Sequence, residues 1–357
     1  MGAVTSDSPL DLGGDVWIRQ DPALPAAARR LAATFGRRIG LTAERVSEAE
    51  LAVTEVATNL VRHAVDGSLL LRISRDRESA ALELVAVDSG PGIGDVAHAR
   101  RDGVSSAGTL GIGLGAVGRL ADHLDIHSLP GRGTVLAAWF WSRPGAGGAA
   151  APRPAGDPIA DGLTRPISGE TICGDQWAVR DDPGAAPSYQ GGPLLVMLCD
   201  GLGHGLLAAR AAQDAVAAFH RSGRQDPQGV LADIHRAISG TRGGAAAVAR
   251  IEPAEHRIQY CGVGNISGFL IGAESRNALL SAPGIVGHQL PRLRMFEQEL
   301  PHGSALVMHS DGLVERWSPA RIPGLLDHSP VVIAGQLLRE AAVRHDDAGV
   351  VVAKGRW

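Results

Sequence analysis

A stretch rich in proline and glycine near the middle of the chain most constrains how this sequence can fold. From Ser142 to Thr164 it reads SRPGAGGAAAPRPAGDPIADGLT, and no hydrophobic periodicity runs through it. Proline and glycine at this density interrupt helices and strands, which is typical of a flexible linker. The sequence therefore predicts two separately folded domains, residues 1–141 and 165–357, joined by a linker over residues 142–164.

Length and composition agree with two domains and argue against several classes of partner. The chain has 357 residues, of which 45% are hydrophobic, enough to bury two cores. Its formal net charge is -4, so there is no global basic field to attract nucleic acid or anionic lipid. No apolar run approaches the roughly 20 residues that a membrane span needs, and the N-terminus does not resemble a signal peptide. We expect no nucleic-acid partner and no membrane contact.

The cysteine content indicates a reducing compartment. Cys173, Cys199 and Cys261 are too few and too scattered for a disulfide framework, and they lack the C-x-x-C spacing of a metal site. We therefore expect a cytoplasmic protein.

Hydrophobic spacing predicts an α/β sandwich for the first domain. Apolar residues recur at helical spacing in two long stretches, and short apolar runs between turn residues indicate strands. The expected helices are residues 24–39, 43–65 and 116–121, and the expected strands are residues 69–74, 81–88 and 134–141. Candidate core positions of the second helix are Leu51, Val53, Val56, Leu60 and Val61.

Strands dominate the second domain, with helices interleaved, which favours a layered fold of sheets and helices. A buried strand over residues 194–198 ends at Asp200, and an alanine-rich helix is expected over 206–220. Further expected strands are residues 245–251, 256–263, 268–271, 304–309 and 350–353, and further expected helices are 230–238 and 331–344.

Two polar residues in the second predicted helix carry the first sign of chemistry. Glu55 and Asn59 are four residues apart, so both project from one face of the helix, one turn apart. Asn59 can offer an oxygen to Mg²⁺, and Glu55 can accept a proton from an attacking hydroxyl. A solvated helix face is the alternative for this pair taken alone.

Glycine clusters follow along the chain. DSGPGI begins at Asp88 after a predicted strand, GTLGIGLG runs over residues 108–115 before a predicted helix, and Gly131 opens GRGT. Glycines in such places let the backbone approach phosphates closely. The run at 108–115 differs from a dinucleotide-binding fingerprint, because no strand immediately precedes it and no acidic ribose partner follows at the usual distance.

Taken in order, these four elements resemble the N, G1, G2 and terminal Gly-Thr boxes of the GHKL ATPase superfamily. The resemblance covers residues 24–141 and is nearest to the small anti-sigma serine kinases of the RsbT type. It implies a Bergerat α/β sandwich that binds ATP and Mg²⁺, with Glu55 as the catalytic base and Asn59 as the Mg²⁺ ligand. It further implies an adenine anchor at Asp88 and nucleotide contacts at Gly90, Gly92, Gly111, Gly113, Gly115 and Thr134.

Acidic residues of the second domain stand at strand ends or in glycine turns. They occur in CGDQW, MLCDGLGHG, MHSDGL and RHDDAG, where Asp-Gly is also an ordinary turn dipeptide. Carboxylates that meet in one place repel one another, so divalent cations are their natural partners, and oxygen ligands favour Mg²⁺ or Mn²⁺. His204 of GLGHG can act as a general acid or simply shape the turn.

The ordered acidic set resembles the PPM-type metal-dependent phosphatases, in their small SpoIIE-like branch. The resemblance covers about residues 168–354 and implies a layered β-sandwich flanked by helices. It implies two Mn²⁺ or Mg²⁺ ions bound by Asp175, Asp200, the carbonyl of Gly201, Asp311 and Asp346. One position departs from the family pattern, because Gly349 stands where threonine is usual.

Together the resemblances imply a two-domain α/β protein that acts as a switch in bacterial sigma-factor regulation. The first domain would phosphorylate a serine or threonine of a STAS-domain anti-sigma antagonist or a stressosome-like protein. The second would remove phosphate from a phosphoprotein substrate. Two alternatives stay open: the first domain binds ATP and regulates the phosphatase without transferring phosphate, or both domains are degenerate scaffolds.

Overall fold

The computed structural model describes residues 15–75, 79–100, 113–142, 159–343, 345–355 and 357. The chain divides into two compact units, Met1–Ala151 and Pro152–Trp357. Most of the predicted linker lies outside the described residues, but its predicted end is wrong. Residues 160–164 belong to strand β6 (Ala160–Arg165), which pairs with the last strand of the chain. Glycine and aspartate in this stretch mimic linker composition, although pairing buries most of the strand.

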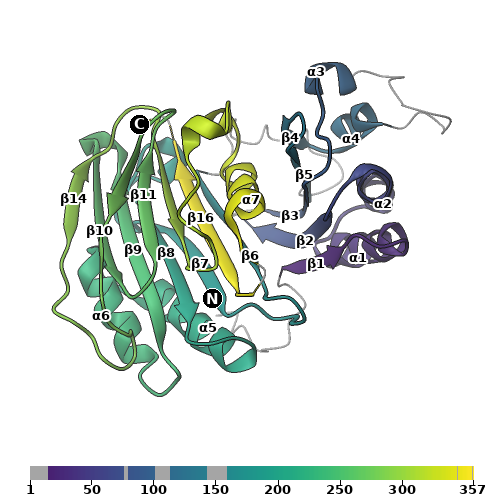
Figure 1. Ribbon diagram of the computed structural model, residues 1–357. Coiled ribbons are helices and arrows are strands. Elements are labelled where there is room, and N and C mark those ends of the chain that lie inside the picture. Colours follow the sequence, from purple (N-terminus) through teal and green to yellow (C-terminus); the bar gives the residue numbers. More distant parts are fainter. Residues whose placement is uncertain (1–14, 76–78, 101–112, 143–158, 344, 356) are drawn as a thin grey trace. The chain divides into compact units, whose positions relative to one another are not determined.

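An antiparallel sheet of five strands, in the order β1-β2-β3-β5-β4, forms the frame of the first unit (Figure 1). The sequence patterns missed β1, which is four residues long, and β4, whose histidines and aspartate break the apolar run. The strands are β1 (Val16–Arg19), β2 (Ser68–Arg75), β3 (Ala80–Asp88), β4 (His123–Leu129) and β5 (Gly133–Trp141).

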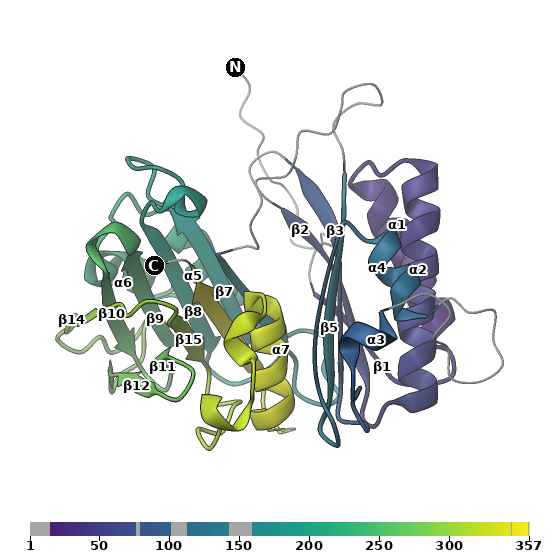
Figure 2. The same ribbon diagram turned by 90° about the horizontal axis from the view of Figure 1, so that it is seen from above.

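Helices cover one face of this sheet, as Figure 2 shows, so the predicted α/β sandwich is confirmed. Thr42 begins the longest of them, since its side chain accepts a hydrogen bond from Arg45 N at 3.2 Å. Leu51 was wrongly predicted as a core residue: it is 42% exposed, because the buried stripe of this helix runs along another face. The helices are α1 (Leu24–Arg38), α2 (Ala43–His63), α3 (Val96–Ala99) and α4 (Leu114–Leu120).

Two sheets packed face to face make up the second unit. One has the strand order β13-β10-β9-β8-β7, with β14 beside β10, and the other has the order β12-β11-β15-β16-β6 (Figure 1). The strands of the first sheet are β7 (Asp175–Asp181), β8 (Leu194–Gly201), β9 (Gly244–Glu252), β10 (Arg257–Val263), β13 (Ser281–Ala282) and β14 (Phe296–Glu299). Those of the second, besides β6, are β11 (Ser267–Ile271), β12 (Arg276–Leu279), β15 (Ala305–His309) and β16 (Ala348–Lys354).

Helices flank the two sheets, which confirms the layered β-sandwich. An apolar cluster between the sheets includes Tyr260 and Met308, and a second cluster joins the first sheet to α5 (Leu206–Arg221) and α6 (Pro227–Ala237). On the other sheet, α7 (Pro330–Ala341) packs against β16 and β6. The core therefore fixes the strand ends from which the acidic residues project.

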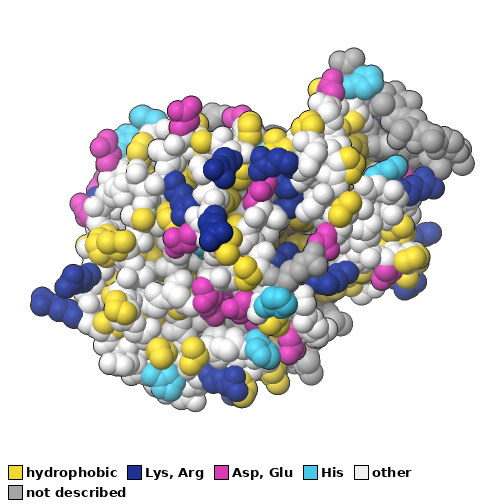
Figure 3. Space-filling view, in the orientation of Figure 1, with side chains coloured by type: hydrophobic (Ala, Val, Ile, Leu, Met, Phe, Trp, Pro, Cys, Tyr) yellow, Lys and Arg dark blue, Asp and Glu magenta, His cyan; other side chains and the backbone are white. Residues whose placement is uncertain are grey.

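Charges of both signs are interspersed over the face of the molecule in Figure 3. Among the described helices, none has both the length and the apolar character needed to cross a membrane.

Candidate functional site

A cavity of roughly 420 Å³ in the first unit is lined by residues from all the predicted nucleotide boxes that the structure describes. From α2 come Glu55 and Asn59, whose Nδ2 donates a hydrogen bond to Glu55 Oε1 at 3.5 Å. Burial raises the pKa of Glu55, and the hydrogen bond from Asn59 and the charge of Arg62 oppose that rise. His63, at the end of α2, also lines the cavity.

The turn that follows β3 brings the backbone close to the cavity. Asp88 Oδ1 accepts a hydrogen bond from Gly90 N at 2.7 Å, and a Cβ on Gly90 would lie 2.9 Å from that oxygen. Gly92 has φ +69°, and a Cβ there would lie 2.3 Å from the carbonyl oxygen of Leu129. Only glycine fits at position 92 without displacing the neighbouring backbone.

The β4–β5 hairpin closes the cavity on another side. Thr134 lies opposite Asp88 in the register of β5 and β3, and both line the cavity. Ser128 was missed by the sequence patterns: its Oγ lies 2.8 Å from Thr134 Oγ1 and accepts a hydrogen bond from Ile93 N at 2.7 Å. A serine on a short polar strand gives no signal before the two loops are seen to meet.

The G2 glycines are only partly placed. Gly113 precedes the first residue of α4 and lines the cavity, and Gly115 is buried in the first turn of that helix. Gly111 lies outside the described residues.

In the second unit, two predicted metal ligands face each other on neighbouring strands. Asp175 begins β7 and is paired in register with Asp200 of β8. Asp175 is fully buried: its Oδ2 accepts a hydrogen bond from Ser310 Oγ at 2.6 Å, while its Oδ1 has no hydrogen-bond partner among the described residues. Burial raises the pKa of Asp175, and the charge of Asp200 adds to the rise.

Loops from the other sheet bring two more carboxylates to this place. Burial raises the pKa of Asp200 to about 7, and the charges of Asp311 and Asp346 add to the rise. The pKa of Asp346 is likewise raised by burial and by Asp311, whereas His204 opposes the rise. We call Asp175, Asp200, Asp311 and Asp346 the acidic centre.

The two aspartates of RHDDAG have different environments. Both side-chain oxygens of Asp347 accept backbone hydrogen bonds, from Ile167 N at 2.7 Å and from Gly174 N at 2.8 Å. Asp347 therefore holds the loop before β7, while Asp346 joins the acidic centre. Another residue missed from the sequence is Asn265, whose Nδ2 donates to Asp311 Oδ2 at 2.5 Å.

Comparisons with known proteins agree with this division. Residues 18–139 match the family model of the histidine kinase-like ATPase domain, and residues 190–354 match that of stage II sporulation protein E (SpoIIE). The serine/threonine-protein kinase RsbT of Bacillus subtilis is 34% identical over 117 residues, which are 33% of this chain and 88% of that protein. Through its first unit the chain belongs to the histidine kinase-like ATPase family. Its second unit is similar to the SpoIIE family, and we call it the SpoIIE domain.

Two further relatives support the fusion of an RsbT-like and an RsbX-like module. The phosphoserine phosphatase RsbX of Bacillus subtilis is 24% identical over 147 residues, 41% of this chain and 69% of that protein. The anti-sigma F factor of Pasteuria penetrans is 30% identical over 117 residues, 31% of this chain and 78% of that protein. The predicted relationship is confirmed. Asp175 lies before the residues matched to SpoIIE, so its place in the centre depends on its pairing with Asp200.

The donor set of the SpoIIE domain suits a hard cation. Buried carboxylates with raised pKa values are stabilised by nearby positive charge, and all four predicted side-chain ligands offer oxygen. Within the described ranges, no three side chains of histidine, cysteine, aspartate or glutamate converge closely enough to hold a metal ion as they stand.

The backbone of the turn after Asp200 is sterically constrained, as is expected where a backbone carbonyl binds a ligand. A Cβ on Gly201 would lie 2.2 Å from the carbonyl oxygen of Ala208, so the chain accepts only glycine here. Three residues later in this loop, His204 is largely exposed, and its Nδ1 lies 3.5 Å from Glu170 Oε1.

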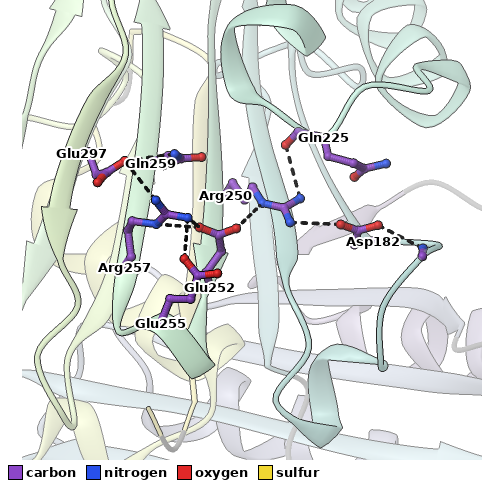
Figure 4. Close-up of polar contacts among 9 residues, drawn as sticks. Asp182, Gln225, Arg250, Glu252, Glu255, Arg257, Gln259 and Glu297 are labelled. Atoms are coloured by element: carbon purple, nitrogen blue, oxygen red, sulfur yellow. Dashed lines mark hydrogen bonds and ion pairs between the residues drawn. The ribbon is translucent and has the colours of Figure 1, made fainter.

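A second charged cluster of the SpoIIE domain is built differently (Figure 4). Arg250 contacts Asp182 at 3.0 Å and Glu252 at 2.8 Å, and Arg257 Nε donates to the other oxygen of Glu252 at 2.8 Å. Arg257 also contacts Glu297 at 3.4 Å. We call these residues the arginine network. Each buried carboxylate in it has an arginine partner, as expected of a cluster that stabilises the fold.

Proposed function

We propose that this chain is a two-way phosphorylation switch. Its ATPase domain transfers phosphate from ATP to a serine or threonine of a STAS-type anti-sigma antagonist or stressosome-like protein. Its SpoIIE domain removes phosphate from phosphoserine or phosphothreonine in the same or a related protein. The observation that carries the proposal is that one chain combines a cavity lined by Glu55 and Asn59 with an acidic centre built around the buried Asp175. Relatives named as a kinase, a phosphatase and an anti-sigma factor support it.

In the ATPase domain, each predicted residue has a role that its position suits. Asn59 would hold Mg²⁺, Asp88 would hold the adenine, and the G2 glycines would surround the phosphates. Bound ATP would supply the phosphoryl group, and the Mg²⁺ ion would neutralise the charge of the phosphates. Glu55 would accept the proton of the attacking hydroxyl at its carboxylate, and its raised pKa makes it a stronger base than an exposed glutamate.

In the SpoIIE domain, Asp175, Asp200, Asp311, Asp346 and the carbonyl of Gly201 would hold two Mn²⁺ or Mg²⁺ ions. Such ions supply positive charge for the phosphate and lower the pKa of a bound water.

The surrounding residues keep these ligands in place. Ser310 holds one oxygen of Asp175 and leaves the other to face Asp200. Asn265 holds Oδ2 of Asp311 and leaves Oδ1 available. Asp347 accepts a hydrogen bond from Gly174 N, directly before Asp175, and so holds the loop that positions Asp175.

Transfer of ³²P tests both halves with the full chain. Candidate STAS proteins are labelled with Mg-[γ-³²P]ATP, and loss of label is then followed in Mn²⁺. We expect Glu55→Ala to abolish labelling, because it removes the proton acceptor. The matched control is Glu50→Ala on the same helix, whose carboxylate contacts only Arg29 at 3.7 Å among its described ion pairs.

Two results would overturn the proposal in distinct ways. Labelling that survives Glu55→Ala excludes the assigned base. ATP binding without transfer to any STAS protein, together with nucleotide-dependent phosphatase activity, would replace the kinase half by an ATP-dependent docking module.

A further inference from the structure

Large apolar side chains are exposed on two segments that border the acidic centre, the loop before β7 and the stretch from Leu202 into the first turn of α5. Ile172 is 41% exposed, Leu202 51%, Leu206 70% and Leu207 52%. We call these four residues the apolar rim. Single exposed leucines are ordinary, but a group of them around a reactive site is typical of a surface that another protein covers.

The two loops of the rim lie side by side. His204 Nδ1 on one loop lies 3.5 Å from Glu170 Oε1 on the other. A Cβ on Gly174 would lie 3.0 Å from the Cβ of Ala208, so the loop before β7 also lies against the first turn of α5. Ile172 is therefore held next to the leucines that follow Gly201.

The rim is continuous with the acidic centre. Leu202 follows Asp200 by two residues, and Ile172 precedes Asp175 by three. A Cβ on Gly174, the residue before Asp175, would lie 2.8 Å from Asp347 Oδ2 and 3.0 Å from the Cβ of Ala208, so the centre and the rim share this loop. A phosphorylated chain whose phosphate enters the centre can therefore place its neighbouring residues on the rim.

A positive charge completes this surface. The guanidinium of exposed Arg242 lies against the same loop, with Nη1 3.1 Å from the position of a Cβ on Gly203. Within the part of the chain that the structure describes, Arg242 forms no ion pair, in contrast to Arg250 and Arg257. An unpaired arginine beside a cluster of carboxylates suits a phosphate that must approach against their charge.

We propose that the apolar rim and Arg242 bind a phosphorylated protein segment whose phosphoserine or phosphothreonine is flanked by apolar side chains. This inference rests on the proposed phosphatase activity and names its substrate class. The apolar side chains of the substrate would cover Leu206 and Leu207, and its phosphate would lie towards Arg242 and the acidic centre. Selectivity between substrates would come from the residues on either side of the phosphorylated residue. Burying one or two apolar side chains supports a preference of about tenfold.

Two synthetic phosphoserine peptides of equal length test the inference with the full chain in Mn²⁺. One has leucine on both sides of the phosphoserine and the other has serine there. We expect the wild-type chain to hydrolyse the leucine-flanked peptide with a kcat/KM about tenfold higher. We expect the Leu206→Ser and Leu207→Ser double variant to bring the ratio of the two kcat/KM values close to one.

The matched control is Tyr189→Ser. Tyr189 is 59% exposed and lies in the loop at the far end of the β7–β8 hairpin from Asp175 and Asp200, so this variant keeps the wild-type ratio. Circular dichroism melting confirms that both variants fold, and hydrolysis of the serine-flanked peptide shows that the centre still works.

Three results separate the possible failures. Equal hydrolysis of both peptides by the wild-type chain overturns the inference and leaves the phosphatase standing. No hydrolysis of either peptide or of p-nitrophenyl phosphate in Mn²⁺ overturns the proposed function itself. Equal hydrolysis combined with a dimer that dissociates in the double variant assigns the rim to a second copy of this chain.

Discussion

The SpoIIE domain contains two clusters of partly or fully buried carboxylates, and only one of them is electrically balanced. In the arginine network, burial opposes ionisation of Asp182, but the hydrogen bond from Gly184 N and the contact with Arg250 still lower its pKa. In the acidic centre, burial and neighbouring carboxylates raise the pKa of Asp200 to about 7. No lysine or arginine of the described residues forms an ion pair with the centre.

The difference separates structural charge from functional charge. Paired carboxylates contribute to stability, because each has the partner that its desolvation requires. Unpaired carboxylates packed together reduce stability, so a fold that keeps them is using them for something else. This argument supports the proposal that the acidic centre binds cations, whereas the arginine network supports the sheet.

The largest expected effect comes from removing a carboxylate of the centre. We expect Asp200→Asn to lower the rate of phosphate release from p-nitrophenyl phosphate on the order of 10³-fold, because a central cation ligand is lost. Rates are measured in Mn²⁺ at fixed substrate. The matched control is Asp182→Asn in the arginine network, which keeps the rate. A variant of Asp200 with wild-type activity would contradict the assignment of the centre.

In the arginine network we expect a substitution to lower stability and leave activity unchanged. Arg250→Ala leaves Asp182 and Glu252 without their shared partner, and these side chains are only 15% and 11% exposed. We expect a loss of about 3 kcal/mol in the free energy of unfolding, with phosphatase activity retained at temperatures where the chain stays folded. Chemical denaturation followed by circular dichroism measures the loss.

A surface arginine provides the control for that experiment. Arg236, which pairs with Asp233 and is 71% exposed, should cost no more than about 0.5 kcal/mol when changed to alanine. Equal losses for Arg250→Ala and Arg236→Ala would mean that the arginine network contributes nothing beyond ordinary surface pairs.

The same contrast explains what the sequence could predict. The residues of the acidic centre follow apolar runs or occupy glycine turns, so pattern and spacing found Asp200 and Asp311 before any geometry was known. The arginine network has no such signature, since Arg250 and Glu252 are separated from Asp182 by about 70 residues. Their partnership depends on the pairing of β8 with β9, which no local pattern encodes.

Supporting residues were missed for a related reason. Ser128, Ser310 and Asn265 each act by joining two segments that are distant in the chain, and a single serine or asparagine gives no local signal of such a contact. The long amphipathic helices and the buried strands were predicted well, because a period of 3.6 or an apolar run is visible locally. Strand β7 was missed because polar residues at both ends of its sequence DQWAVRD leave only three apolar residues in a row.

Metal addition should stabilise the SpoIIE domain through the acidic centre and not through the arginine network. With Mn²⁺ at about 100 times its dissociation constant, binding to the folded state adds about 2.7 kcal/mol, or roughly 5–10 °C in the melting temperature of the SpoIIE domain. We expect this shift relative to EDTA in the wild-type chain and in Arg250→Ala. In Asp200→Asn it should largely disappear, and an unchanged shift there would place the cation elsewhere.

The smallest effect tests Arg242, which lies against the loop of the acidic centre and belongs to neither cluster. Arg242 contacts the loop of the acidic centre without an ion pair among the described residues, so its charge is available to a substrate phosphate. We expect Arg242→Gln to raise KM for phosphoserine peptides about fivefold while kcat changes less, since an exposed charge contributes about 1 kcal/mol. Arg221→Gln is the control, because Arg221 ends α5, roughly 20 Å from the rim residue Leu206 that begins it. If both variants changed KM equally, the effect would come from overall charge, and if neither did, phosphate would enter the centre without help from Arg242.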